Sequence, residues 1–189
     1  MLRVNPFETC PVYETEFMLF TLVKEEDAAD LFECYTDPIT KSHMNNDNCG
    51  GVWNIHGIEP VLGAIRSWNK VFKEKFFIRW SITNKPTNKV IGTIEIAPIP
   101  NTTRFLDGEC KIGILRIDMI SSCENESTFS EILNMVTNHF FDDFAIERIL
   151  TKAEKIDTER VIALKNCKFS EVPDKSIIPY QDYYLKERL

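Results

Sequence analysis

The amino-acid sequence predicts an α/β (α+β) fold, with a central, mostly antiparallel mixed sheet flanked by about four helices. Short apolar runs with alternating polar residues recur along the chain. Between them lie longer stretches in which apolar residues repeat every three or four positions. The 189-residue chain is 43% hydrophobic and has no internal repeat and only seven scattered glycines, so we expect a single domain over residues 1–189.

The chain is predicted to open with a strand and a helix. A short apolar run indicates the strand at 17–23. In the helix that follows, one face carries the apolar residues Ala28, Leu31, Phe32 and Tyr35. Asp37-Pro38 is expected to end this helix. Residues 40–57, which are rich in asparagine, are expected to form a loop.

A second helix and a hairpin are predicted next. The helix is indicated by apolar residues at helical spacing, namely Ile58, Val61, Leu62, Ile65 and Phe72. Alternating residues then predict strands at 76–82 and 90–97, joined by a turn at 84–88. A long strand rich in Ile and Leu is expected at 109–119.

The last third is predicted to contain two more helices and three strands. A four-turn helix is expected over 129–144, with Thr128 and Glu131 spaced as a capping box. Alternation predicts a strand at 148–154, and Asp157 is placed to cap a shorter helix that runs to about Cys167. The closing strands are expected at 169–172 and 180–185.

Charge and hydropathy limit the partners of the chain. Lys and Arg number 22 against 29 Asp and Glu, which gives a formal net charge of −7. A net acidic chain is a poor ligand for a phosphate backbone, so we expect no nucleic-acid partner. No apolar run approaches the roughly 20 residues of a membrane span, and the first residues do not look like a signal peptide. We therefore expect a cytoplasmic protein without a membrane partner.

The cysteines and histidines do not form a metal-binding pattern. None of the six cysteines belongs to a C-x-x-C pair, and the closest two are Cys110 and Cys123. His43, His56 and His139 also lack the spacing of metal ligands. We expect no metal and reduced thiols.

Three segments of the sequence together form a recognisable pattern. The first is Tyr35-Thr36-Asp37-Pro38. The second is the hairpin Arg79-Trp80-Ser81-Ile82 with Asn88-Lys89-Val90-Ile91-Gly92-Thr93-Ile94. The third runs from Phe141-Asp142-Asp143-Phe144-Ala145-Ile146-Glu147-Arg148-Ile149 to Asn166-Cys167-Lys168-Phe169. With these segments the sequence resembles the GNAT superfamily of acetyl-CoA-dependent N-acetyltransferases, above all its ribosomal-protein-alanine acetyltransferase (RimJ/RimL-like) branch. The resemblance covers nearly the whole chain and implies a GNAT-like fold, with a sheet that splays at the cofactor.

The resemblance implies that acetyl-CoA is the co-substrate. Its pantetheine arm would pair with the strand edge at Ile117, Met119 and Ile120. Its pyrophosphate would sit on a Gly-rich loop at the start of the next helix, where backbone N–H groups favour negative charge. In this sequence Asn125 and Ser127 stand where the family has its glycines, Glu126 stands where a Lys is common, and Thr128 follows. These replacements are expected to weaken CoA binding by about one to two orders of magnitude.

The last helix departs from the family in a second place. The family often has Asn and Ser near the start of this helix, where the sequence has Asp157 and Arg160. Arg160 does not release a proton at neutral pH, so it cannot replace the serine as a general acid. It either contacts a phosphate or an acyl carboxylate, or is a solvated arginine on the helix surface.

Direct acetyl transfer to an amine needs a base, an oxyanion donor and a proton for the leaving thiolate. Glu95 is the first candidate for the base, with a solvated strand face as the alternative; Asp118 is a weaker candidate. The backbone N–H of Met119 or Ile120 fits the oxyanion donor. Among Tyr180, Tyr183 and Tyr184, Tyr183 is the candidate hydroxyl donor, although aromatic strand residues usually serve packing. Tyr35 and Trp80 either line the acceptor pocket or belong to the core.

The function expected from these residues and from the resemblance is acetyl-CoA-dependent N-acetyltransfer to a primary amine. The acceptor would be a protein N-terminus, an amino acid or a small amine. The alternative is a GNAT-fold binding or regulatory protein that has lost acetyl transfer, as the altered loop and Arg160 suggest. Family members often form homodimers, so a homodimer is also an option for this chain.

Overall fold

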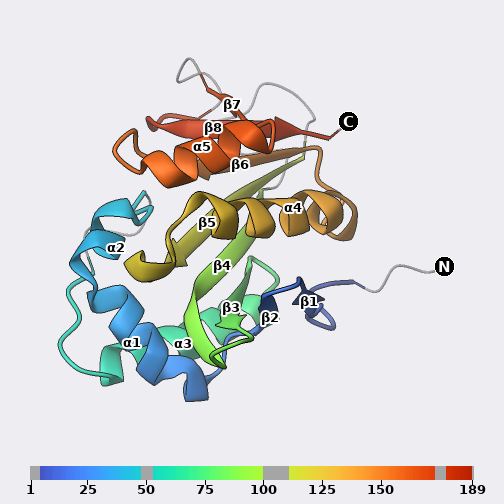
Figure 1. Cartoon of the computed structure of the whole chain (residues 1–189). Helices are drawn as coiled ribbons and strands as arrows, with labels where there is room; N and C mark the ends of the chain where they lie inside the picture. Colours follow the sequence, from blue (N-terminus) through green and yellow to red (C-terminus); the bar gives the residue numbers. More distant parts are fainter. Residues whose placement is uncertain (1–4, 48–52, 100–110, 173–177, 189) are drawn as a thin grey trace. The chain divides into compact units, whose positions relative to one another are not determined.

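The computed structural model describes residues 5–47, 53–99, 111–172 and 178–188 (Figure 1). In chain order the strands and α-helices are β1 (Tyr13–Glu14), β2 (Met18–Leu22), α1 (Ala28–Thr36), α2 (Pro38–His43), α3 (Glu59–Lys73), β3 (Ile78–Asn84), β4 (Lys89–Ile99), β5 (Ile112–Met119), α4 (Glu126–Asp143), β6 (Arg148–Lys152), α5 (Thr158–Asn166), β7 (Ser170–Glu171) and β8 (Tyr183–Glu187). Short 3-10 helices lie at Glu25–Asp27 and Ser121–Cys123. The eight strands have the order β1-β2-β3-β4-β5-β6-β8-β7.

This sheet confirms the predicted fold class. The β5–β6 pair is parallel, whereas β1–β2, β2–β3, β6–β8 and β7–β8 are antiparallel. Five α-helices occur in the described ranges, one more than the sequence predicts. None of the helices in these ranges is long and apolar enough to cross a membrane.

The chain divides into two compact units. The first comprises residues 1–95 and 117–123, and the second comprises residues 96–116 and 124–189. Strands β4 and β5 each contribute residues to both units. The single domain expected over 1–189 stays a prediction, and the two units are described separately below.

The first unit is built on β2 and β3, against which α3 packs, with α1 packed on α3 in turn. In the antiparallel β2–β3 pair, Leu22 lies opposite Trp80. The predicted apolar faces of the two helices are buried together: the core contains Val23, Ala28, Leu31, Tyr35, Val61 and Ile65. The periodic spacing of these residues accounts for their shared burial. At the start of the predicted strand 76–82, Phe76 is exposed, because β3 begins two residues later at Ile78.

Helix α2 occupies the start of the segment that was expected to be a loop. The Asp37 side chain accepts hydrogen bonds from the N–H groups of Ile39 and Thr40, and Pro38 occupies the first turn. An aspartate cap followed by proline is a standard helix start. Asp37-Pro38 therefore ends α1 and at once begins α2, which the prediction of a simple stop missed.

The second unit is organised by α4 and by the pairing of β5, β6 and β8. Residues Ile112–Leu115 of β5 pair in parallel with Arg148–Thr151 of β6. Helix α4 packs against α5 (Figure 1). The predicted apolar face of α4 is buried, through Phe129, Ile132, Leu133, Val136 and Phe140.

Several element boundaries differ from the predicted ones. Helix α4 begins at Glu126 with Asn125 as its N-cap, so the capping box expected at Thr128 and Glu131 is wrong. Strand β5 begins at Ile112, and residues 109 and 110 of the expected strand lie outside the described ranges. The two closing strands are confirmed, but β7 spans two residues and β8 begins at Tyr183.

Gly92 in β4 is required by a close backbone approach in the first unit. A Cβ atom at this position would lie 2.1 Å from the carbonyl oxygen of Asp118 in β5. The Gly92→Ala substitution should therefore push the two strands apart and lower the free energy of unfolding by about 2 kcal/mol. Thermal or denaturant unfolding measures this loss.

Gly63→Ala is the matched control. Gly63 lies in helix α3, and a Cβ atom added there would have open space around it among the described residues. Alanine should therefore raise the free energy of unfolding by about 0.5–1 kcal/mol, because it favours the helix more than glycine does. Equal stability of the two variants would contradict the close approach at Gly92.

Candidate active site

A buried ion pair joins β3 and β4 in the first unit. Arg79 donates two hydrogen bonds to Oε2 of Glu95, from Nε at 3.0 Å and from Nη2 at 2.7 Å. The two side chains are only 7% and 5% exposed. Charged hydrogen bonds of this kind are among the strongest in proteins, and burial makes the loss of either partner costly.

The same guanidinium gathers three further groups. Its Nη1 lies 3.2 Å from both the Tyr35 hydroxyl and Oγ1 of Thr93, and 3.4 Å from Oδ2 of Asp118. The two hydroxyl oxygens are 2.7 Å apart. Thr93 shares a strand face with Glu95 because side chains two residues apart point to the same side. One arginine thus connects β3, β4, the end of β5 and helix α1.

Charge and burial act together on the titration of this network. Burial alone would lower the pKa of Arg79, but the neighbouring Glu95, Tyr35 and Asp118 outweigh it and raise that pKa above its ordinary value. Burial also raises the pKa of Tyr35, against the opposing effect of Arg79. The Tyr35 hydroxyl therefore stays protonated, and the Arg79 guanidinium stays charged, at neutral pH.

These contacts decide between the two interpretations of Glu95 only in part. The solvated strand face offered as the alternative is wrong, because the Glu95 side chain is buried against Arg79. A carboxylate in the middle of a strand is accommodated here by a charged partner on the neighbouring strand. The role of Glu95 as a base stays a prediction.

The Trp68 ring lies over the guanidinium and belongs to an aromatic cluster. The Arg79 Cζ atom lies 4.3 Å from the centroid of the Trp68 ring, close enough for a cation–π contact. Trp53, Trp68 and Tyr35 pack on one another with centroids 5.3–6.2 Å apart. Sequence reasoning missed Trp53 and Trp68, although Trp68 continues the apolar spacing of Val61 and Ile65 in helix α3.

Tyr35 and Trp80, the expected pocket residues, are both buried in the first unit. The indole N–H of Trp80 donates to the carbonyl of Pro11 at 2.8 Å, and the ring is wholly buried. Trp80 is therefore a core residue, which was the alternative interpretation of this tryptophan, and it does not line a pocket here. Tyr35 is a core residue with a hydroxyl that belongs to the Arg79 network.

The end of β5 offers backbone groups on one edge only. The N–H of Ile120 donates to the carbonyl of Ile91 at 2.8 Å, which makes it a poor choice for an oxyanion donor. Because successive residues of a strand direct their backbone groups to opposite neighbours, Ile117 and Met119 direct theirs to the edge away from β4. On that side the pairing of β5 with β6 ends at Leu115 and Thr151.

Helix α2 holds this end of β5 within the first unit. The Thr40 hydroxyl donates to the carbonyl of Met119 at 2.9 Å, and the Ser121 hydroxyl donates to Asp37 at 2.6 Å. Burial alone would raise the pKa of Asp37, but hydrogen bonds from Ser121, Thr40 and Ile39 outweigh it and lower the pKa. The same carboxylate thus caps α2 and anchors the segment after β5.

The start of helix α4 in the second unit is occupied by side chains of the chain itself. Oδ1 of Asn125 accepts from the N–H and the hydroxyl of Thr128, at 3.0 and 3.1 Å. The N–H of Glu126 donates to Oε2 of Glu159 at 2.8 Å. The expected cofactor-binding residues at this helix start, Asn125, Glu126, Ser127 and Thr128, are therefore brought together. Two of their N–H groups are already engaged.

The Glu126 carboxylate does not point past the end of the helix. Its Oε1 accepts hydrogen bonds from the Ser130 hydroxyl and from the side-chain amide of Asn166, both at 3.1 Å. The carboxylate that faces the N–H groups at the helix start is that of Glu159. Sequence reasoning missed this residue, because the register between α4 and α5 cannot be deduced from either helix alone.

Arg160 is buried, so the expected solvated arginine is wrong. Its side chain is 4% exposed and pairs with Glu124 at 3.3 Å and with Asp157 at 2.8 Å. The short contact with Asp157 is ionic, because the Nε–H is not aimed at the carboxylate oxygen. The guanidinium also lies 4.8 Å from the Phe129 ring centroid. Asp157 caps helix α5 through the N–H of Arg160, as predicted.

Tyr183, the candidate hydroxyl donor, lies in β8 and is buried in the second unit. Its ring packs in a cluster with Ile112, Leu150 and Ile178, and lies 6.4 Å from the Tyr180 ring. This position accounts for the tyrosine as a packing residue. A catalytic role for its hydroxyl stays a prediction.

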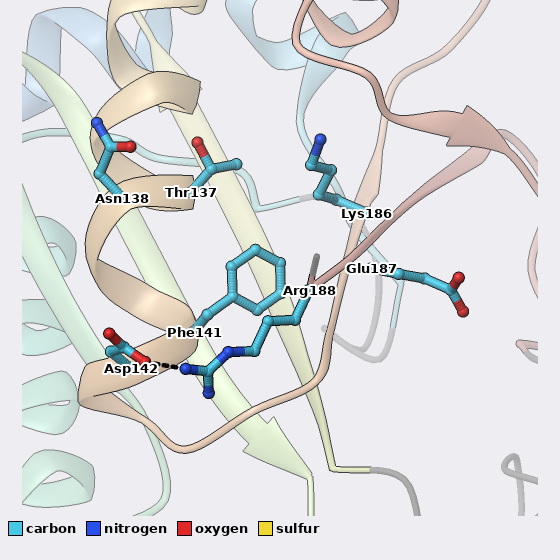
Figure 2. Close-up of a pocket in the computed structure, with 7 residues that line it drawn as sticks. All are labelled: Thr137, Asn138, Phe141, Asp142, Lys186, Glu187 and Arg188. Atoms are coloured by element: carbon cyan, nitrogen blue, oxygen red, sulfur yellow. Dashed lines mark hydrogen bonds and ion pairs between the residues drawn. The ribbon is translucent and has the colours of Figure 1, made fainter.

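A surface hollow of about 330 Å³ lies between α4 and β8 in the second unit (Figure 2). Figure 2 shows an ion pair between Asp142 and Arg188, with the Phe141 ring beside it. Lys186 and Glu187 complete one wall. The hollow contains none of the residues expected to bind acetyl-CoA or to catalyse its reaction.

Comparisons with known proteins agree with this architecture. Residues 18–170 match the model of the acetyltransferase (GNAT) domain family. The chain is 25% identical over 140 residues to the uncharacterized N-acetyltransferase YoaA of Bacillus subtilis (strain 168), an alignment that covers 74% of this chain and 71% of that protein.

Two solved structures share the fold. The ribosomal alpha-N-protein acetyltransferase RimL in complex with coenzyme A superposes with a TM-score of 0.68 and 10% identity, over 94% of this chain and 98% of the other. The spermidine N-acetyltransferase of Vibrio cholerae, in complex with CoA and spermine, superposes with a TM-score of 0.62 and 11% identity, over 84% of this chain and 83% of the other.

The Arg79–Glu95 pair generates a prediction about stability. Glu95→Gln should lower the free energy of unfolding by about 3–5 kcal/mol, because it leaves a buried guanidinium with one charged partner fewer. The double variant Arg79→Met, Glu95→Met should lose much less than the summed losses of the single variants Arg79→Met and Glu95→Met. Denaturant unfolding of the four proteins measures the coupling, and additive losses would contradict the pairing.

The buried Arg160 generates a second prediction. Arg160→Ser, which restores the residue type common in the family, should destabilise the protein by about 3 kcal/mol or more, because Glu124 and Asp157 lose their guanidinium. Lys165→Ser, at an exposed site of the same helix, is the control and should change stability by less than about 0.5 kcal/mol. If Arg160→Ser is as stable as the control, the arginine is not a structural charge.

Proposed function

Because the chain belongs to the GNAT acetyltransferase family, we propose that it is an acetyl-CoA-dependent N-acetyltransferase that acts on a primary amine. In this reaction the amine nitrogen forms a bond to the acetyl carbonyl carbon, and the carbon–sulfur bond breaks. One proton leaves the nitrogen and one reaches the thiolate, which gives an N-acetyl amine and CoA. The proposed acceptor is a protein N-terminus, an amino acid or a small amine.

The observation that carries the proposal is the strand edge at the end of β5. Ile117 and Met119 direct their backbone groups away from β4, beyond the last residues that pair with β6. A strand edge of this kind can accept the amide groups of a pantetheine arm as a further strand would. Thr40 binds the Met119 carbonyl and so holds the edge in position.

The chemistry requires the amine to be neutral when it attacks. We propose Glu95 as the group that accepts the amine proton, directly or through water, and Asp118 as the weaker alternative. The Met119 N–H, rather than that of Ile120, is the proposed donor to the developing oxyanion. Tyr183 is the proposed proton source for the leaving thiolate.

The names of the similar proteins support an amine acceptor without selecting one. RimL is named as an acetyltransferase of protein α-amino groups, and the Vibrio cholerae enzyme as one of spermidine. For this chain the acceptor, a metal-free reaction, a cytoplasmic location and a homodimer all stay predictions.

A second candidate function is a GNAT-fold binding or regulatory protein that has lost acetyl transfer. The observation in its favour is the start of helix α4, where Glu159 accepts from the Glu126 N–H and where the Arg160 guanidinium is paired with Glu124 and Asp157. A pyrophosphate could use these groups only after they leave their present partners within the chain.

Calorimetric titration with acetyl-CoA, followed by a screen of amines for CoA release, tests the proposal. We expect a dissociation constant between about 1 µM and several hundred µM, with CoA release in the presence of a suitable amine. S-acetyl-pantetheine, which lacks the pyrophosphate, is the control ligand for the strand edge. No binding of acetyl-CoA up to millimolar concentration would support the second candidate instead.

A further inference from the structure

The N-terminal end of helix α4 holds a carboxylate from a different helix. Glu159 lies in the first turn of α5, and its Oε2 accepts a hydrogen bond of 2.8 Å from the N–H of Glu126, the first residue of α4. A negatively charged acceptor at this position is favoured both by the hydrogen bond and by the helix dipole. It makes the kind of contact that a phosphate oxygen makes at a helix start.

A buried cluster holds Glu159 at this place. Its neighbour Arg160 is enclosed by Glu124, Asp157 and the Phe129 ring, and these contacts tie the first turn of α5 to the first turn of α4. Arg160 therefore acts as a positioning residue for Glu159. The Glu159 side chain itself is exposed, so a rotation about its own side-chain bonds is enough to release the N–H.

The Glu126 carboxylate also lies at the helix start, but it does not take the place of Glu159 at the backbone N–H. The Glu126 side chain is bound by Ser130 and by Asn166, on the flank of the helix. Asn125 accepts from Thr128 as an ordinary neutral cap. Glu159 is thus a charged group that receives a hydrogen bond from the α4 N-terminus.

We infer that Glu159 is an intramolecular competitor for the pyrophosphate of acetyl-CoA and sets the affinity of the protein for this co-substrate. The inference rests on the proposed function, because it assigns the α4 start to the pyrophosphate. Binding of the co-substrate requires Glu159 to leave the Glu126 N–H, and its charge near the phosphates opposes binding even after it has left. Removal of the charge removes the repulsion and weakens the hydrogen bond that has to break.

Glu159→Gln tests this role with the smallest change in shape, and Glu159→Ala removes the acceptor altogether. Glu147→Gln is the matched control: it removes the same charge from an exposed glutamate beyond the C-terminal end of α4. At low ionic strength we expect acetyl-CoA to bind both Glu159 variants about five- to tenfold more tightly than the unaltered protein. The control substitution should change the affinity for acetyl-CoA by less than about twofold. Added salt should narrow the difference in affinity between the Glu159 variants and the unaltered protein.

A second measurement follows the site itself without any turnover. Inorganic pyrophosphate is titrated into isotope-labelled protein, and the amide resonances of Glu126, Ser127 and Thr128 are recorded. These resonances should shift at lower pyrophosphate concentration in Glu159→Gln than in the unaltered protein or in Glu147→Gln.

The outcomes separate this inference from the proposed function. If acetyl-CoA binds all four proteins equally, Glu159 is not a competitor, while the proposed co-substrate stands. If pyrophosphate shifts the three amides in the Glu159 variants but acetyl-CoA supports no amine acetylation, the competitor role stands and the proposed transfer fails. If neither ligand binds any of the proteins, both are overturned.

Discussion

The buried charge of Arg79 is the constraint on which the first unit depends. A guanidinium enclosed in a core must be compensated, since an unpaired buried charge costs more than most single interactions contribute. Glu95 and Asp118 supply the opposite charge, and Tyr35 and Thr93 supply oxygen acceptors. To meet this requirement, side chains from three strands and from helix α1 have to converge.

The second unit also contains a buried guanidinium, that of Arg160, but its partners connect different elements. Glu124 and Asp157 compensate the guanidinium, and the Phe129 ring covers it. Here the compensated charge joins the starts of two helices instead of three strands. As a consequence Glu159 meets the N-terminus of α4, which is the part of the family's architecture that ordinarily receives an anion from outside the protein.

With the proposed function, the chain combines a family fold with an altered start of the helix assigned to the pyrophosphate. The strand edge at Ile117 and Met119 is the edge proposed for a pantetheine arm, whereas the helix start holds an Asn125 cap and the neighbouring Glu159 carboxylate. An internal carboxylate lowers the affinity for an anionic ligand without abolishing it, because an exposed side chain can rotate away. This arrangement is compatible with an acetyltransferase of modest affinity, and it is also what a binding protein would inherit after transfer is lost.

The sequence by itself determined those features that depend on a local pattern of residues. Apolar spacing was enough to predict the buried faces of α1, α3 and α4, and the motifs around Arg79 and Phe141 were enough to identify the family. Local pattern did not determine which charged residues are buried. Glu95 was expected either to be solvated or to act as a base, and Arg160 to be solvated or to bind an anion. Both are buried: Glu95 meets Arg79 on the neighbouring strand, and Arg160 meets Glu124 before α4 as well as Asp157 at the start of its own helix. Only the tertiary structure decides such pairs, since a buried charge is stable only where the fold brings its counter-charge within hydrogen-bonding distance.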